Sequence, residues 1–242
     1  MAHSFYVSYK ISGSTAVIQD AESLHHLRDV LRLKPGDNVS LFDSEGNEYS
    51  GKIASQDSKQ AAVSITGCRK APPRKHKITF ACAIPKKSLM DDIVDRLTQL
   101  GVDSIIPLET ERVVVKIEDN RQPRLERWRK IARSAAEQSR RNTVPEIPGI
   151  LGFKEVLALA GDTDLKLIPT LTAERKILKE ALGRDQFKDI LVLIGPEGDF
   201  TDKEVEQAVG VGFVPVSLGG SVLRAETAAV AVASYLRFEI TE

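Results

Sequence analysis

The loop at residues 194–201 contains residue types that suit ligand binding and reads IGPEGDFT. Gly195 and Gly198 allow the backbone to approach a ligand closely, and Pro196 stiffens the loop. The loop follows an apolar run of strand length, and ligands of open α/β sheets bind at the carboxyl ends of strands. The sequence therefore predicts a binding loop here. A tight strand-to-helix turn without a ligand is the alternative.

A second glycine-containing loop covers residues 218–227 and reads LGGSVLRAET. The helix expected after it is rich in small apolar residues, and we expect such a helix to be buried. A charged pair at its entrance, Arg224 and Glu226, is therefore more typical of a functional site than of a solvated surface. The alternative is a glycine-rich turn that carries two surface charges.

Neither loop matches the common nucleotide-binding motifs. The patterns GxxxxGK[ST] and GxGxxG are absent from both loops. Both loops also come late in the chain, whereas a Rossmann fingerprint opens its first βαβ unit. A nucleotide-like ligand would therefore need a different α/β pocket, and a nicotinamide oxidoreductase is the least favoured interpretation.

The charges of the chain are unevenly distributed, although 34 Lys and Arg balance 34 Asp and Glu. Residues 112–141 carry ten basic and four acidic side chains, a net charge of +6, and residues 142–242 have a net charge of −6. An arginine-rich patch of this kind favours contact with phosphates. A solvated amphipathic helix is the alternative, since Pro123 begins a helix with an apolar stripe of Leu125, Trp128, Ile131 or Ala132, and Ala135.

The elements that must position these residues fall into two groups. Residues 1–72 are rich in short alternating runs, at 15–18, 39–42, 48–53 and 61–66, which predict strands, with one helix over 21–33. Many short strands with one helix indicate a small barrel. The proline-containing and charged segment 71–76 is the predicted linker.

Residues 73–242 alternate between strand and helix patterns, which predicts a parallel sheet covered on both faces. The predicted strands cover residues 77–84, 104–108, 165–169, 189–194 and 212–218. The predicted helices cover residues 89–100, 124–140, 153–159, 173–182, 202–209 and 225–238.

Four segments together resemble the RsmE family of 16S rRNA methyltransferases in the SPOUT superfamily. The loop sequences IGPEGDFT and LGGSVLRAETA resemble its two cofactor motifs, and the match extends through HHLRDVLRLKPGD at 25–37 and SAAEQSRR at 134–141. The resemblance implies an α/β fold in which an N-terminal PUA-like RNA-binding β-barrel precedes a SPOUT methyltransferase domain. That domain would have a parallel sheet and a deep trefoil knot. It also implies S-adenosyl-L-methionine as cofactor, a homodimer, and methylation of uracil N3 in the decoding region of the small ribosomal subunit.

Carried over by position, the resemblance implies a cofactor pocket of three loops, the first of which follows the strand ending at Pro169. The chemistry of the reaction indicates the catalytic candidates, and the charge pattern indicates the RNA-binding arginines. The cofactor would contact Thr170, Leu171, Gly195, Pro196, Glu197, Gly198, Leu218, Gly219, Leu223, Arg224, Ala225 and Thr227. Arg224 would stabilise the uracil anion and Glu226 would orient the base or accept its proton, although a pair that only shapes the loop fits equally well. The RNA-binding set is Arg28, Arg32, Arg124, Arg127, Arg133, Arg140 and Arg141.

Two other functions remain open at this point. One is a non-catalytic RNA-binding or ribosome assembly factor, and the other is a SPOUT methyltransferase with a different acceptor, such as a ribose 2′-hydroxyl. No metal is expected, because Cys68 and Cys82 form no CxxC motif and the adjacent His25 and His26 point about 100° apart on a helix. No membrane partner is expected, because no apolar run is long enough to cross a bilayer, and no secretory signal is visible. A cytoplasmic location is therefore expected.

Overall fold

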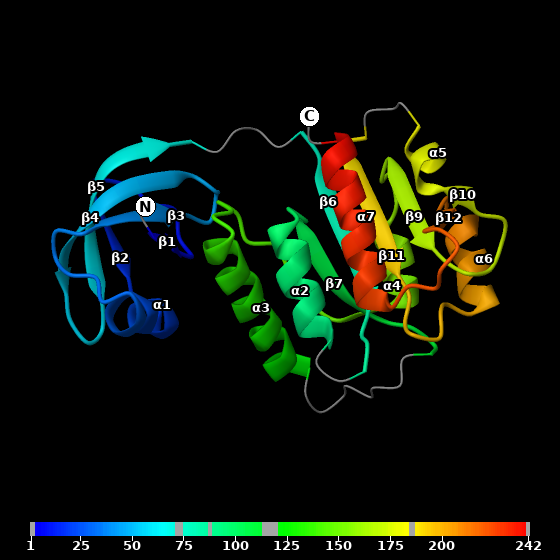
Figure 1. The fold of residues 1–242 in the computed structure, drawn as a ribbon, viewed down its shortest axis with the longest axis horizontal. Coiled ribbons are helices and arrows are strands. Elements are labelled where there is room, and N and C mark those ends of the chain that lie inside the picture. The colour runs from blue at the N-terminus through cyan, green and yellow to red at the C-terminus, as the bar shows by residue number, and fades with distance from the viewer. Residues whose placement is uncertain (1–2, 71–74, 87–88, 113–120, 184–186, 241–242) are drawn as a thin grey trace. The chain divides into compact units, whose positions relative to one another are not determined.

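The computed structural model describes residues 3–70, 75–86, 89–112, 121–183 and 187–240 of the chain, which divide into two compact units (Figure 1). The N-terminal unit comprises Met1–Pro73 together with Ala136–Val144, and the C-terminal unit comprises Arg74–Ala135 and Pro145–Glu242. Residues 136–144, which the sequence predicts in the C-terminal domain, pack with the N-terminal unit instead. Residues 71–74 of the predicted linker lie outside the described residues.

The N-terminal unit is a curled five-stranded sheet in the order β1-β3-β4-β5-β2 (Figure 1). All its pairings are antiparallel except that of β1 with β3, which is parallel. Inward-facing Phe5, Ile18, Leu41 and Val63 are buried in one apolar core. The predicted β-rich unit is confirmed as a half-barrel, with strands at His3–Tyr6 (β1), Thr15–Ile18 (β2), Asn38–Phe42 (β3), Glu48–Gln56 (β4) and Ala61–Arg69 (β5).

The predicted helix over 21–33 consists of two short pieces. Asp20 caps the first, α1 (Ala21–His25), by accepting a hydrogen bond of 3.0 Å from the Ser23 amide. The chain continues as a π-helical turn, η1 (His26–Val30), and the Leu31 amide donates to the His26 carbonyl at 2.9 Å. The left-handed backbone of Arg32, at φ +55°, ends the helical segment.

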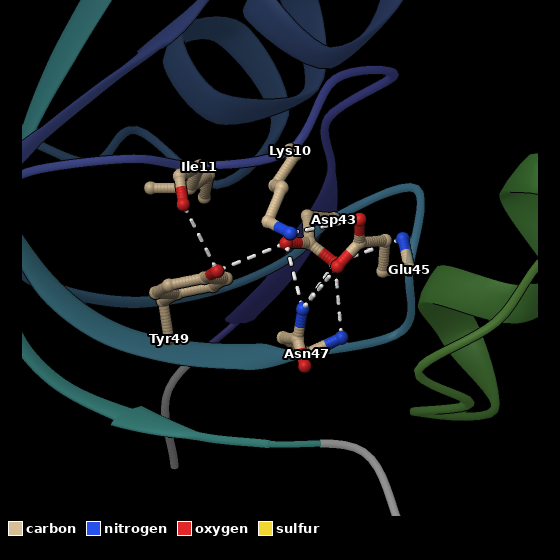
Figure 2. A network of polar contacts seen from close by, with 6 residues as sticks. All are labelled: Lys10, Ile11, Asp43, Glu45, Asn47 and Tyr49. Carbon is tan, nitrogen blue, oxygen red and sulfur yellow. Dashed lines mark hydrogen bonds and ion pairs between the residues drawn. The ribbon is translucent and has the colours of Figure 1, made fainter.

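A buried carboxylate organises the turn between β3 and β4 (Figure 2). Asp43 is 1% exposed and accepts hydrogen bonds from the backbone amides of Glu45 and Asn47, at 2.9 and 3.0 Å. The Tyr49 hydroxyl lies 2.9 Å from Asp43 and 3.2 Å from the carbonyl of Ile11. Burial alone would raise the pKa of Asp43, but hydrogen bonds from Asn47, Tyr49 and the backbone bring it below its ordinary value.

We expect Asp43→Ala to lower the local stability of the N-terminal unit by about 2–4 kcal/mol, because it leaves buried donors unsatisfied. Since the native pKa lies below that of an unfolded aspartate, near 3.9, the charge-dependent part of this stability is complete above that value. It is lost as the pH falls through the native pKa. Hydrogen exchange of the amides in β3 and β4, followed from pH 7 downward, measures both effects. Glu22→Gln, at an exposed position of α1, is the matched control. Equal exchange in Asp43→Ala and the wild type would contradict the expectation.

The C-terminal unit contains a seven-stranded, entirely parallel sheet in the order β10-β12-β9-β11-β6-β7-β8. The strand predictions for this unit are confirmed, apart from shifts at their ends and two short edge strands, β8 and β10, that the sequence did not indicate. The strands are Lys77–Ala83 (β6), Ser104–Glu109 (β7), Leu151–Gly152 (β8), Leu165–Pro169 (β9), Lys176–Ile177 (β10), Asp189–Ile194 (β11) and Val214–Ser217 (β12).

Helices cover both faces of this sheet, as the apolar strands require. On one face α7 packs against α2, β6 and β11, and on the other Phe153, Val156, Val205 and Ala208 of α4 and α6 join the buried cluster beneath β7, β9 and β11. The helices are Leu89–Gln99 (α2), Arg121–Gln138 (α3), Phe153–Leu159 (α4), Leu178–Leu182 (α5), Asp202–Gly210 (α6) and Ala225–Ile240 (α7). None of the helices in the described part of the chain is long and apolar enough to cross a membrane.

One expectation about the helices was wrong. The helix expected over 173–182 begins only at Leu178, because Ala173 has a left-handed backbone at φ +66° and Lys176–Ile177 pairs with β12 as strand β10. The α7 helix is buried on one face only, through Ala225, Ala229, Val232, Ala233 and Leu236. Its opposite face is accessible in the single chain, and Phe238 is 76% exposed there.

Candidate functional site

The three loops that the sequence analysis singled out for a cofactor meet in one pocket. Strands β12, β9 and β11 are neighbours and run parallel, so their carboxyl ends lie at the same edge of the sheet (Figure 1). The loops that follow them line a pocket that encloses about 610 Å³ of atom-free space, part of it open to solvent. A pocket at this position is typical of open α/β sheets, whose ligands bind at the carboxyl ends of the strands.

Nine of the twelve residues in the expected cofactor set line this pocket. They are Thr170, Leu171, Gly195, Pro196, Glu197, Leu218, Gly219, Leu223 and Ala225. Gly198, Arg224 and Thr227 are not among the lining residues. Gly198 instead presents its carbonyl to Arg112, whose Nη1 lies 2.6 Å away, and Arg224 and Thr227 have exposed side chains around the start of α7.

Glycine at position 195 is required by close packing. A Cβ atom there would lie 3.1 Å from two ring carbons of Phe200 and 3.3 Å from a carboxylate oxygen of Asp199. Phe200 is fully buried and packs against Phe153, with ring centroids 5.6 Å apart, so it has little room to move. Because Gly195 has no side chain, the backbone at the end of β11 can pack closely against Phe200 and Asp199.

Hydrogen bonds fix the loop after β11 to its neighbours. The Lys86 amide donates to the carboxylate of Glu197 at 3.0 Å, and Asp199 accepts from the hydroxyl of Thr170 at 2.9 Å and from the amide of Leu171 at 2.7 Å. The loop then enters α6 through a capping box between Thr201 and Glu204, as the TDKE sequence indicates.

Two charged pocket residues were missing from the set expected from the sequence. Asp199 stands inside the IGPEGDFT segment, between residues that the sequence already indicated for the loop. Arg175 was placed inside a helix by its periodicity, but it lies in a loop and its Nη1 donates to the Thr170 carbonyl at 3.2 Å. The remaining additions are mostly apolar or small: Pro169, Ile194, Val216, Ser221, Val222 and Ala228.

The pair proposed for catalysis lies at the first turn of α7. Arg224 is exposed immediately before the helix, and Glu226 is half-buried in its first turn. Both residues are described, and they form no ion pair with each other.

The predicted apolar stripe of the basic helix α3 is confirmed, since Leu125, Trp128, Ala132 and Ala135 are buried. Trp128 Nε1 donates to Asp91 of α2 at 3.1 Å, and the same carboxylate pairs with Arg127. Arg124 and Arg133 are half-buried. Arg127 therefore has an internal partner, which reduces its availability for a phosphate.

The other predicted RNA-binding arginines belong to the N-terminal unit. Arg28 is half-buried and donates to the Asp57 carbonyl at 2.9 Å, whereas Arg32 is exposed. Arg140 and Arg141 line a polar hollow of this unit together with Ser4, Ser40, Leu41, Phe42, Glu48 and Asn142. Arg140 has a left-handed backbone at φ +56°, an unfavourable conformation for a non-glycine residue.

Within the described ranges, no group of three or more His, Cys, Asp or Glu side chains is arranged to hold a metal ion. Burial raises the pKa of the Cys82 thiol in β6, so this residue does not act as a thiolate.

A parallel α/β sheet with a pocket at the carboxyl ends of three adjacent strands, together with a small curled β unit, defines a two-domain α/β protein with a candidate small-molecule site. Residues 72–237 match the RNA methyltransferase domain, and residues 18–66 match the RNA methyltransferase PUA domain. The chain belongs to the ribosomal RNA small subunit methyltransferase E family.

Relatives and solved structures agree with this assignment. The ribosomal RNA small subunit methyltransferase E of Synechocystis sp. is 34% identical over 93% of this chain and 76% of its own length. A methyltransferase of Legionella pneumophila, solved with its bound cofactor SAM, superimposes with a TM-score of 0.89 at 31% identity over 98% of both chains. The ribosomal RNA small subunit methyltransferase E of Neisseria gonorrhoeae, bound to S-adenosyl methionine, has a TM-score of 0.86 at 30% identity over 99% of this chain and 98% of its own.

Proposed function

We propose that this protein transfers a methyl group from S-adenosylmethionine to N3 of one uridine in the decoding region of 16S rRNA. The observation that carries the proposal is the pocket at the ends of β9, β11 and β12. It occurs in a chain whose solved relatives, of nearly the same length, are bound to S-adenosylmethionine. The named relatives are methyltransferases of the small-subunit ribosomal RNA.

The residues of the pocket fit this cofactor chemically. S-adenosylmethionine has two cationic groups, the sulfonium and the α-ammonium, and one carboxylate. The charged residues that line the pocket, within the described part of the chain, are the two carboxylates Glu197 and Asp199 and the guanidinium of Arg175. Leu218 and Leu223 supply apolar surface for the adenine ring, and the glycine-containing loops expose backbone N–H and C=O groups that can bind its edge. We propose the nine predicted residues that line the pocket, together with Arg175 and Asp199, as the cofactor site, with Gly198, Arg224 and Thr227 at its margin.

When bound, S-adenosylmethionine supplies the methyl group, and the electron pair of the broken C–S bond stays on sulfur. The uracil N3 forms the new N–C bond with the electron pair that its lost proton leaves behind. Positioning of the base in line with the methyl group supplies most of the acceleration. We assign Arg224 to the uracil carbonyls, where a cation stabilises the anion, and Glu226 to orientation of the base or acceptance of its proton.

The target uridine must be unpaired or lifted from its stack, because N3 lies on its base-pairing edge. We therefore expect activity on an assembled, structured subunit and not on arbitrary duplex RNA. The arginines of α3 and of the N-terminal unit would contact phosphates. The proposed set remains Arg28, Arg32, Arg124, Arg127, Arg133, Arg140 and Arg141.

We expect Arg124→Ala to weaken RNA binding at low salt and to reduce the slope of log K against log [salt] by about 1, the value for one lost phosphate contact. Arg127→Ala should change the slope less, because Asp91 already pairs with that guanidinium. Titration of labelled small-subunit RNA at several salt concentrations measures both slopes. Identical slopes for wild type and Arg124→Ala would remove this arginine from the interface.

We further propose a homodimer formed through the accessible face of α7. The exposed Phe238 and Ala231 on that face support this proposal, since a helix of such composition favours burial. Sedimentation equilibrium should then give twice the chain mass of 26.6 kDa. We also propose a trefoil knot around the pocket and a location in the cytoplasm, where small ribosomal subunits are found.

The decisive experiment is transfer of radiolabelled methyl from S-adenosylmethionine to small subunits that lack the modification, followed by nucleoside analysis. Label in 3-methyluridine supports the proposal in full. Label in another nucleoside would retain the methyltransferase and refute the acceptor atom. Absence of both label and cofactor binding would favour a non-catalytic RNA-binding factor.

A further inference from the structure

Asp199 adopts a backbone conformation that non-glycine residues seldom occupy. Its φ is +59°, in the left-handed region, within the turn closed by its amide, which donates to the Pro196 carbonyl at 3.0 Å. Aspartate tolerates this region better than most residues, but glycine adopts it without strain. A charged side chain at this position therefore needs a compensating role.

The carboxylate of Asp199 joins two of the pocket loops. One oxygen accepts from the Thr170 hydroxyl at 2.9 Å and the Leu171 amide at 2.7 Å, and the other accepts from the amide of Phe200 at 2.8 Å. Hydrogen bonds to a carboxylate are stronger than those between neutral groups. The loop after β9 is thereby held against the loop after β11.

Thr170 extends this connection to the third strand. It is 6% exposed, and its amide donates to the Val216 carbonyl of β12 at 3.3 Å. A continuous path of hydrogen bonds therefore runs from β12 through Thr170 to Asp199 and the loop after β11. Val216, Thr170 and Asp199 all line the pocket.

We propose that Asp199 is a positioning residue that fixes the shape of the pocket and that its charge favours S-adenosylmethionine over S-adenosylhomocysteine. The inference rests on the proposed function, since it requires that this pocket hold the cofactor. The two molecules differ by the sulfonium charge, which is lost when the methyl group leaves. A carboxylate in the pocket wall attracts the cationic cofactor and holds the demethylated product less tightly.

Three variants distinguish the effect of the hydrogen bonds of Asp199 from the effect of its charge. Asp199→Asn keeps the side-chain shape and one acceptor oxygen for Thr170 and Leu171, and it removes the charge together with the hydrogen bond from the Phe200 amide. Asp199→Gly removes the hydrogen bonds and also relieves the backbone strain, so a loss of affinity would not reflect a poorer turn. Thr170→Val removes one hydrogen bond and keeps the charge. Asp202→Asn removes an exposed carboxylate of α6 outside the pocket and serves as the control.

Calorimetric titration of the full chain with each of the two molecules tests the proposal without any methyl transfer. We expect Asp199→Asn to reduce the preference for S-adenosylmethionine about tenfold. Asp199→Gly should weaken the binding of both molecules by about tenfold or more. Thr170→Val should weaken the binding of both molecules by about the same factor and leave the preference for S-adenosylmethionine unchanged. In methyl transfer, the Asp199 variants should raise KM for the cofactor more than they lower kcat.

Wild-type preference in Asp199→Asn, or wild-type affinity for both molecules in Asp199→Gly, would overturn the inference and leave the proposed function intact. An equal loss of preference in Asp202→Asn would also overturn it, because the effect would then reflect net charge. Absence of binding of either molecule to the wild-type protein would refute the cofactor assignment, and the inference with it.

Discussion

Replacement of Ala228 by tryptophan should weaken S-adenosylmethionine binding at least 100-fold, which corresponds to about 2.7 kcal/mol. Ala228 lines the pocket from the first turn of α7, and it is only half-buried, so the helix can accept a larger side chain. The indole would project into the space that we assign to the cofactor. Calorimetric titration measures the loss, and methyl transfer to unmodified subunits should fall by a similar factor at limiting cofactor.

Val209→Trp is the matched control for this experiment. Val209 is 45% exposed near the end of α6 and does not line the pocket, so the same substitution there should leave affinity unchanged. The mass in solution must also be measured for Ala228→Trp, because α7 is the helix that we propose for the dimer. Normal cofactor affinity in Ala228→Trp would show that the cofactor binds elsewhere.

Replacement of Arg224 by alanine should lower kcat by about 100- to 1,000-fold, the usual cost of removing one group that stabilises a developing anion. The affinity for S-adenosylmethionine should change by less than about threefold, because the Arg224 side chain is exposed and lies outside the pocket lining. Single-turnover methyl transfer to unmodified subunits measures the rate, and calorimetry measures the affinity. Arg224→Lys should restore part of the rate, since it retains the positive charge.

Glu226→Gln distinguishes a proton acceptor from an orienting residue. If Glu226 accepts the N3 proton, the rate of the variant should recover as the pH rises, because the uridine then loses this proton without help. An orienting role predicts a reduced rate at every pH. Lys203→Ala, at an exposed position of α6, is the control for a loss of surface charge.

For the prediction about Arg224, full turnover by Arg224→Ala would refute the catalytic assignment of this arginine.

Much of the fold could be predicted from the sequence, because local patterns decided it. The strands Thr15–Ile18, Leu165–Pro169 and Asp189–Ile194 begin and end where the apolar runs predict. In these segments alternation or continuous burial agrees with the turn residues on either side. The IGPEGDFT loop could also be predicted, since its glycines, its proline and the capping box that follows are signals carried by neighbouring residues.

Prediction failed where tertiary packing overrode a local pattern. The periodicity of residues 173–182 is helical, but Lys176–Ile177 pairs with β12 and removes the first half of that helix. The segment Ala136–Val144 begins in the last turn of α3, whose earlier residues belong to the C-terminal unit, and yet it packs with the N-terminal unit, where the amide of Tyr6 donates to Glu137 at 2.9 Å. Neither pairing partner is near in sequence, so no local window indicates it.

By itself, the sequence determined the two-part organisation, the parallel sheet, the three loops at the pocket and nine of the residues that line it. Only the tertiary structure decided that Arg175 and Asp199 face that pocket and that Gly198, Arg224 and Thr227 do not. The physical reason is the strand order, which makes β9, β11 and β12 neighbours although about 20 to 50 residues separate them in the chain. Hydrogen bonds such as that of Asp199 with Thr170, 29 residues apart, then set which side chains face the pocket.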